Sequence, residues 1–424
     1  MWLGVGLNSF GGPAGQIAVL HRETVERRKW IDEARFLHAL DLCMLLPGPE
    51  AQQLAVYSGW ILHGVRGGLA AGILFVLPGA LAMLALCFLY VEARDLGWFQ
   101  AVFLGVKCAV VALVAGAVWR VAARSLKTAT AWCVATAAFG ATFVLGIAFP
   151  FVVGAAIALG IVIERLRPGS LRPHETPEPI AAELERPSIA RSLRTAIVGL
   201  ALWLAPVSIF VALDPGGGVQ AAMARFFTGA SVVTFGGAYA ALSYTAEHAS
   251  AAGGWLSPGE MADGLGLAES TPGPLILVLQ FVAFVGAYHH PGQLAPVVSA
   301  LLASAVMLWT TFAPCFLWIF LFAPWMEHAR ANRRIAAALA AVTAAVVGVI
   351  LDLAVWFAIH VLFREVRALE LPGVRVEAPV WSSIDAWALL LTALAAFLLF
   401  TRRWPLLAVL ATCAIAGVVG RAFA

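Results

Sequence analysis

The chain has 424 residues, of which 62% are hydrophobic and only 12% are charged, and its mean hydropathy is +0.89. A water-soluble protein of this length needs far more charge to cover its surface, so the composition excludes an ordinary soluble enzyme. The net charge of +3 is small and gives no indication of a nucleic-acid partner.

Long apolar runs recur along the chain and predict transmembrane helices. A helix needs about 20 apolar residues to cross the hydrocarbon core, where its backbone groups must pair internally. In chain order the runs are 69–91, 99–119, 131–163, 197–213, 295–322, 335–363 and 386–400. They predict an all-α polytopic membrane protein.

Three motifs recur at one spacing and indicate an internal repeat. Phe-Gly-Gly at 10–12 returns at 235–237, Trp30 returns as Trp255, and Pro-Gly-Pro at 47–49 returns at 272–274, each 225 residues later. A Pro-, Arg- and Glu-rich stretch without apolar periodicity separates the halves. The predicted organisation is a first repeat (1–164), a cytoplasmic linker (165–194), a connecting transmembrane helix (195–219) and a second repeat (220–424).

Equivalent segments of the two halves differ in charge. Segment 21–35 carries five Arg or Lys residues, whereas its counterpart 246–260 carries none. The positive-inside rule places the first segment in the cytoplasm and the second outside. The sequence therefore predicts two inverted-topology repeats, a common plan among transporters.

The number of crossings in the first half predicts a re-entrant element. An even number of crossings must join the cytoplasmic segments 21–35 and 165–194, yet five apolar stretches lie between them. The stretch 42–64 contains two prolines and several polar residues, so it is the best candidate for a broken helix that turns back. The same reasoning makes 258–288 re-entrant from the outside. The alternative is that 42–64 spans and 128–164 forms one long helix.

The Pro-Gly-Pro break at 47–49 is the first candidate substrate-binding element. Two prolines around Gly48 cannot continue a helix, so backbone groups are freed at membrane depth. A half-helix that begins near Glu50 would direct its N-terminal amides at the break, where an oxyanion can bind. Gln52 and Gln53 add neutral donors. The alternative is a plain proline kink or a surface loop.

The second break repeats this chemistry. Gly273 lies between Pro272 and Pro274, and Ser270 and Thr271 supply nearby hydroxyl donors. The recurrence favours a binding role over a kink. Glu50 is not duplicated, so it either couples protons or only caps its half-helix.

The glycine pairs form a second set of candidate binding elements. Gly11 and Gly12, with Gln16 one turn later, correspond to Gly236 and Gly237 in the second repeat. Glycine permits positive φ and close backbone approach. Close helix packing through small residues explains such pairs equally well.

Lys107 lies in the middle of the run 99–119. A charged group there costs at least about 2.5 kcal/mol unless it is paired or hydrated. It is expected to attract an anion or to pair with Glu50, and the alternative is that it extends to the membrane interface.

No cofactor or metal site is predicted. The six cysteines are scattered through apolar runs without a CxxC pair or a histidine at metal-ligand spacing. The chain also lacks a Gly-rich phosphate loop ending in Lys-Ser/Thr, which favours secondary transport over ATP-driven transport.

The motifs closely resemble those of the chromate ion transporter family. In the first half they are Phe10–Ala18, His21-Arg22, Arg28–Trp30, Phe36-Leu37, Leu45–Leu54, Gly64–Gly68 and Leu77–Gly79, and in the second half Thr234–Gly237 and Thr271–Pro274. The resemblance implies the long two-domain form, with halves of opposite orientation. It also implies efflux of chromate across a bacterial inner membrane, which gives chromate resistance.

The expected partners follow from this resemblance. They are a chromate or sulfate oxyanion, the lipid bilayer, coupled protons and a second copy of the chain in a homodimer, but no nucleic acid. Three other functions are weighed: a carrier for sulfate or another anion, a passive anion channel, and a membrane enzyme acting on lipid phosphates. The enzyme is disfavoured because it would need clustered His, Asp or Arg at one membrane face.

Overall fold

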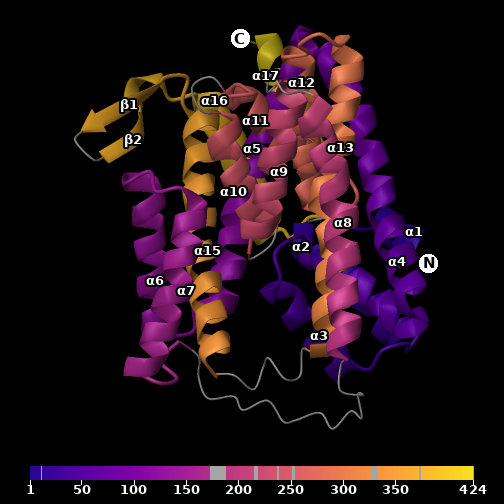
Figure 1. The fold of residues 1–424 in the computed structure, drawn as a ribbon. Coiled ribbons are helices and arrows are strands. Elements are labelled where there is room, and N and C mark those ends of the chain that lie inside the picture. The colour runs from indigo at the N-terminus through magenta and orange to yellow at the C-terminus, as the bar shows by residue number, and fades with distance from the viewer. Residues whose placement is uncertain are drawn as a thin grey trace.

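A computed structural model describes residues 1–10, 12–171, 188–213, 218–235, 238–250, 254–325, 333–371 and 374–423. The described chain is a bundle of helices (Figure 1). Its α-helices are α1 (Trp2–Leu7), α2 (Gly12–His21), α3 (Glu33–Leu45), α4 (Glu50–Ala93), α5 (Gly97–Ser125), α6 (Ala129–Phe139), α7 (Phe149–Leu166), α8 (Ile189–Leu213), α9 (Val219–Val233), α10 (Ala238–Ala249), α11 (Pro258–Ser270), α12 (Val278–His289), α13 (Pro296–Phe322), α15 (Arg333–Leu362), α16 (Ala386–Ala396) and α17 (Leu406–Phe423).

Short elements complete the fold. Strands β1 (Val366–Leu371) and β2 (Val374–Pro379) form an antiparallel pair that runs from Val366 opposite Pro379 to Leu371 opposite Val374. This ribbon projects from the bundle beyond α15 (Figure 1). The π-helical turns are Arg22–Arg27, Gly140–Val144 and Phe397–Thr401, and the 3₁₀ turns are Leu275–Leu277, Ala323–Trp325 and Trp381–Ser383.

Among the described residues, six helices are long and apolar enough to cross a membrane. They cover 50–93, 97–125, 149–166, 189–212, 296–325 and 334–362, and four shorter apolar helices accompany them. This confirms the all-α polytopic membrane fold. The predicted linker 165–194 falls largely on residues 172–187, which lie outside the described part of the chain.

Helix α4 folds back on itself. Its backbone departs from helical geometry at His63 and Gly64, where Gly64 has φ +61°. In a straight helix Val56 and Gly72 would be about 24 Å apart. Instead, a Cβ atom at Gly72 would lie 2.6 Å from Cγ2 of Val56. A first arm (50–62) therefore packs against a second arm (65–93).

The chain from 258 to 289 enters and leaves the bundle at the same end. Glu260 lies in the first turn of α11 and His289 is the last residue of α12, yet Oε1 of Glu260 is 2.8 Å from Nε2 of His289. Between them the chain turns at Pro272–Pro274. This is the geometry that a re-entrant 258–288 requires.

The segments before these breaks form hairpins too. The Trp2 and Trp30 rings, at the two ends of the α1–α2 region, are 6.3 Å apart between centroids. In α9 and α10, Phe226 stacks on Tyr244 with centroids 5.1 Å apart. We name the hairpins 1 (2–27), 2 (33–62), 3 (219–249) and 4 (258–289), and we call the residues at each turn its tip.

The alternative of one long helix over 128–164 is wrong. Helix α6 and its π-helical turn end at Val144, Gly146 adopts φ +60°, and α7 begins at Phe149. Four apolar helical segments therefore lie between hairpin 2 and the linker: the second arm of α4, α5, α6 and α7.

Equivalent helices of the two halves lie at opposite ends of the bundle. In Figure 1, α3 of hairpin 2 lies at the lower end, whereas α11 and α12 of hairpin 4 lie at the upper end. Inverted repeats require this placement. Helix α15 packs against α5, α6 and α7, and α17 packs against α5, so the halves share one core.

Replacing Gly59 by alanine tests the reversal of α4. The new methyl group would meet the carbonyl oxygen of Gly67 and, at 2.6 Å, Cβ of Ala71. We expect a loss of about 1–3 kcal/mol, the usual cost of overpacking, measured as a lower melting temperature of the purified protein. Gly154→Ala is the control, since among the described residues no atom beyond its own stretch of helix lies within 4 Å of its added Cβ. Equal effects of the two substitutions would contradict the folded-back arrangement.

Candidate functional site

The tips of the hairpins are joined by backbone hydrogen bonds that cross between the repeats. The Gly48 amide of hairpin 2 donates to the carbonyl of Thr234 in hairpin 3 at 3.1 Å. The Gly273 amide of hairpin 4 donates to the carbonyl of Ser9 in hairpin 1 at 2.9 Å. Donors and acceptors are each 225 residues apart, so the same bond is made twice.

Glycine is required at both donor positions. Gly48 has φ +115° and Gly273 has φ +94°, conformations that side chains strongly disfavour. A Cβ atom at Gly273 would lie 2.9 Å from Cα of Gly79, beside the proline of α4, and one at Gly48 would lie 2.8 Å from Sγ of Cys315, beside the proline of α13. Each tip thus packs closely against a long helix of the opposite repeat.

These bonds correct one expectation about the breaks. The amides of Gly48 and Gly273 do not stay bare for an anion, because each is bound by a carbonyl of the other repeat. Buried backbone groups are costly to leave unpaired in a low-dielectric interior, and this exchange satisfies two of them. The Pro-Gly-Pro turns therefore give the site its shape, and the hydrogen-bond donors for a ligand must come from other groups.

Glutamine side chains hold the tips in place. Nε2 of Gln16 donates to the carbonyl of Gly273 at 2.8 Å, and Nε2 of Gln53 donates to the carbonyl of Pro47 at 2.7 Å. Both side chains are buried. Gln16 thus links hairpin 1 to hairpin 4, while Gln53 closes the tip of its own hairpin.

A tyrosine and a carboxylate join hairpins 1, 3 and 4. The Tyr239 hydroxyl donates to Oε1 of Glu269 at 2.9 Å, and a Cβ atom at Gly12 would lie 3.3 Å from that hydroxyl. Gly12 itself has φ +70°. Three of the four tips are therefore in direct contact.

Four of the ten buried polar atoms that lack a hydrogen-bond partner in the described chain belong to residues near these tips. Within the described chain they include both amide atoms of Gln52, Oε1 of Gln53 and Oε2 of Glu269. The Gln52 side chain has no exposed surface, and Glu50 beside it is 8% exposed. Because buried polar groups are nearly always paired, this group is the strongest structural indication of a ligand site.

Two arginines of α5 supply positive charge near the tips. The guanidinium of Arg120 lies within electrostatic range of Glu269 and Tyr239, and that of Arg124 lies within range of Glu50. Both arginine side chains are exposed. The tips themselves contain carboxyl and amide groups, so the cations stand at the side of the site.

Not all predicted residues can be placed as free donors. Gly11, Gly236 and Gly237 lie outside the described residues. The hydroxyl of Ser270 donates to the carbonyl of Leu267 at 2.8 Å, and that of Thr271 donates to the carbonyl of Ala268 at 3.0 Å. Both hydroxyl protons are therefore used within or just after α11.

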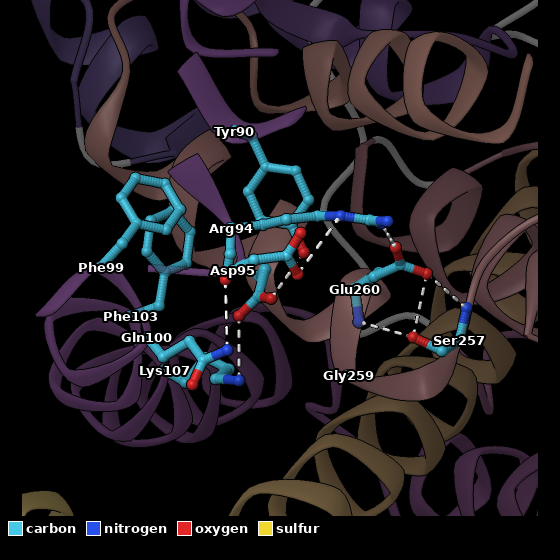
Figure 2. A pocket seen from close by; sticks show the side chains of 11 residues that line it. Tyr90, Arg94, Asp95, Phe99, Gln100, Phe103, Lys107, Ser257, Gly259 and Glu260 are labelled. Atoms are coloured by element: carbon cyan, nitrogen blue, oxygen red, sulfur yellow. Dashed lines mark hydrogen bonds and ion pairs between the residues drawn. The ribbon is translucent and has the colours of Figure 1, made fainter. Parts of the chain in front are cut away.

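Lys107 lies elsewhere, in a cavity at the end of the bundle that carries α11 and α12. Its Nζ is 2.9 Å from Oδ1 of Asp263, so the expected pairing with Glu50 is wrong. We call this space the outer cavity. It has a volume of about 350 Å³ and is lined by Tyr90, Arg94, Asp95, Phe99, Gln100, Phe103, Lys107, Ser257, Gly259, Glu260 and Asp263 (Figure 2).

The outer cavity holds a network of paired charges. Nη1 of Arg94 is 2.9 Å from Oε1 of Glu260, which is also 2.8 Å from Nε2 of His289, and Tyr90 donates to Asp263 at 2.8 Å. Burial favours the neutral acid at Glu260, but hydrogen bonds from His289 and Ser257 outweigh it and lower the pKa to about 2. This carboxyl is therefore ionised at neutral pH.

Several of these residues were not predicted from the sequence. Asp263, Tyr239 and Arg120 carry no local motif, and their roles depend on contacts between residues far apart in the chain. The weak signal was charge in apolar surroundings: Asp263 follows an apolar pair in α11, and Arg120 ends the run 99–119. Such residues are functional candidates by default in membrane proteins.

The fold and the paired breaks define a class: a multi-pass α-helical membrane protein of the transporter type, with discontinuous helices that meet inside the bundle. Comparison with known families is then specific. The chromate transporter family model matches residues 1–161 and 221–418, and the chain belongs to that family.

Relatives named as chromate transport proteins support this membership. The chain is 32% identical to the chromate transport protein of Pseudomonas aeruginosa, over 82% of this chain and 77% of that protein. It is 29% identical to the chromate transport protein of Cupriavidus metallidurans, over 82% and 79%. The probable chromate transport protein of Synechococcus elongatus is 28% identical, over 82% and 81%. No solved structure matches the chain significantly.

Replacing Gly273 by alanine tests the crossed arrangement of the tips. The methyl group would be strained at φ +94° and would press on Cα of Gly79. We expect a lower melting temperature and at least about a tenfold loss of transport, since the tip must move by several tenths of an ångström. Gly292→Ala is the matched control, because Gly292 has φ +63° but open space around it. Equal losses of stability and transport in the two variants would show that backbone strain alone explains the effect, and would contradict close packing of the tip against Gly79.

Proposed function

We propose that this protein is a secondary transporter that exports chromate across the inner membrane of a bacterium and thereby gives chromate resistance. The oxyanion is held among the hairpin tips, where the candidate binding residues are Gly12, Gln16, Glu50, Gln52 and Gln53, and Gly11, Gly236 and Gly237 are proposed with them from the sequence alone. Gly48, Ser270, Thr271 and Gly273 shape the tips, because their amides or hydroxyls already have partners. The observation that carries the proposal is the buried, unpartnered amide of Gln52 beside the crossed backbone bonds.

The chemistry of the tips suits a weakly held dianion. Neutral amide donors and the N-terminal end of α4 can bind an oxyanion without burying a lysine or arginine with it. A buried cation without a counter-charge would hold a dianion too tightly for release. Arg120 and Arg124 instead lie at the side, where they can draw the anion toward the tips.

The membrane potential favours export. Moving a dianion outward across 100 mV, inside negative, releases about 4–5 kcal/mol, because each charge contributes about 2.3 kcal/mol. That sustains roughly a thousandfold gradient without ATP. Uptake of the same ion would need co-transported cations, for which Glu50 and Glu269 are the buried carboxyl groups at the tips.

A sulfate carrier and a passive anion channel are the competing functions. Sulfate is a tetrahedral dianion like chromate, so the same donors would serve both. A channel would conduct far faster than a carrier that must rearrange its hairpins at each turnover. The two-domain organisation and a homodimer, which we also propose, are compatible with each of these functions.

Flux measurements in vesicles test the proposed function. Purified protein is reconstituted, labelled chromate is loaded on the side that corresponds to the cytoplasm, and the potential and proton gradient are set independently. We expect efflux to rise steeply with an outward driving potential and to saturate with chromate. Unlabelled sulfate added with the chromate measures, by competition, which of the two ions the protein prefers. Flux that ignores both potential and proton gradient would contradict secondary transport.

Replacing Gln52 by leucine separates binding from folding. The substitution removes two buried polar atoms that have no partner, so the melting temperature should stay equal or rise. Transport should fall by at least about tenfold, because the ligand loses its amide donor. Flux and thermal unfolding are measured on the same preparation.

Gln53→Leu is the matched control for this experiment. Its side chain donates to the Pro47 carbonyl at 2.7 Å, so its loss should lower stability as well as transport. If Gln52→Leu transports at the parent rate, the assignment of Gln52 to the binding site is wrong.

A further inference from the structure

The outer cavity contains two cations from the first repeat, two carboxylates from the second, and the Asp95 carboxylate of the first repeat. Arg94 and Lys107 belong to the end of α4 and to α5, whereas Glu260 and Asp263 belong to α11 of hairpin 4. Figure 2 shows Arg94, Lys107 and Glu260 around one space between the helices, which Asp263 also lines. The cavity therefore lies at the joint between the repeats.

We propose that the outer cavity is a second oxyanion site, on the path by which cargo leaves the protein. In this site the anion competes with Asp263 and Glu260 for Lys107 and Arg94. The inference rests on the proposed function, and it concerns a site separate from the hairpin tips.

The present partners of the cations resemble an oxyanion in their chemistry. A carboxylate offers two oxygens to Lys or Arg, as a tetrahedral oxyanion does, and Arg suits both geometries. Oδ1 of Asp263 lies 2.9 Å from Nζ of Lys107 but is not aligned as a hydrogen bond. Since an ammonium group has three donor hydrogens, Lys107 can offer some of them to another acceptor.

The balance of charge makes this a weak site, as release requires. Lys107 and Arg94 face Asp263 and Glu260, Asp95 lies 3.9 Å from Arg94, and the His289 ring also contacts Arg94 at 3.0 Å. A dianion gains these cations only by displacing carboxylates. The net binding free energy of the dianion is therefore the difference between two similar interactions, so the binding is weak.

Exchange of partners also links cargo to movement. The carboxylates lie near the start of hairpin 4, whose tip carries Gly273 and packs against Gly79. An anion that takes Lys107 and Arg94 loosens this end of hairpin 4, while the contacts between its tip and the first repeat remain. Closure after release restores the two ion pairs.

A cysteine reporter in the cavity tests the site directly. Gly259 lines the cavity, and in the described part of the chain an added Cβ meets Oγ of Ser257 at an ordinary 3.9 Å, so Gly259→Cys fits without strain. The background carries Cys133→Ser, because Cys133 is the exposed cysteine and the other five are buried. Labelling by an uncharged maleimide-polyethylene glycol is timed in nanodiscs with sodium sulfate or with sodium chloride at equal ionic strength.

The two partners of one ion pair are expected to act in opposite directions. Sulfate should slow labelling of the parent reporter, Lys107→Gln should abolish this protection, and Asp263→Asn should lower the half-protecting sulfate concentration by about tenfold, because a competing charge is gone. Arg364→Gln removes an ion pair with Asp385, which does not line the cavity, and should change nothing. Should Lys107→Gln fail to fold, Arg94→Gln is expected to show the same loss.

Two results would overturn the proposal. One is the absence of any protection by sulfate in the parent reporter. The other is an equal weakening of protection by Lys107→Gln and Asp263→Asn, which a purely structural ion pair would give. Chromate flux is measured separately on the parent protein, so loss of the exit site and loss of the transport function are told apart.

Discussion

Unpaired backbone groups inside a membrane are expensive, and this cost shapes the centre of the protein. Each Pro-Gly-Pro break frees amides and carbonyls that no helix can satisfy. The structure pairs the Gly48 amide with Thr234 and the Gly273 amide with Ser9, each across the boundary between repeats. Neither half pairs the glycine amide of its own break, so the two halves form one unit where the hairpin tips meet.

Charged side chains are placed beside the hairpin tips, and the tips themselves carry few charges. The tips present neutral amides and carboxyl groups, while Arg120 and Arg124 stand beside them and Lys107 is paired with Asp263 in the outer cavity. Under the proposed function, a doubly charged cargo would therefore meet cations before and after the tips and mainly dipoles at the tips. Such an arrangement keeps each binding step weak enough to reverse, which transport across a membrane requires.

Much of the fold was predictable because its signals are local or periodic. Hydropathy gave the polytopic class, and the motifs repeated 225 residues apart marked the breaks and their glycines. Two features escaped prediction for a physical reason. The sequence shows that Gly48 frees an amide but does not show that Thr234 takes it, and it shows a charge at Lys107 without its partner on α11. Contacts between distant segments depend on packing, which no local pattern encodes.

The most direct measurement is a cryo-electron microscopy map of the protein in a lipid nanodisc with chromate bound. The account predicts both Pro-Gly-Pro turns near the middle of the bilayer, in contact with the opposite repeat, and anion density beside the Gln52 amide. Turns at the level of the lipid headgroups, with anion density far from all four tips, would contradict it.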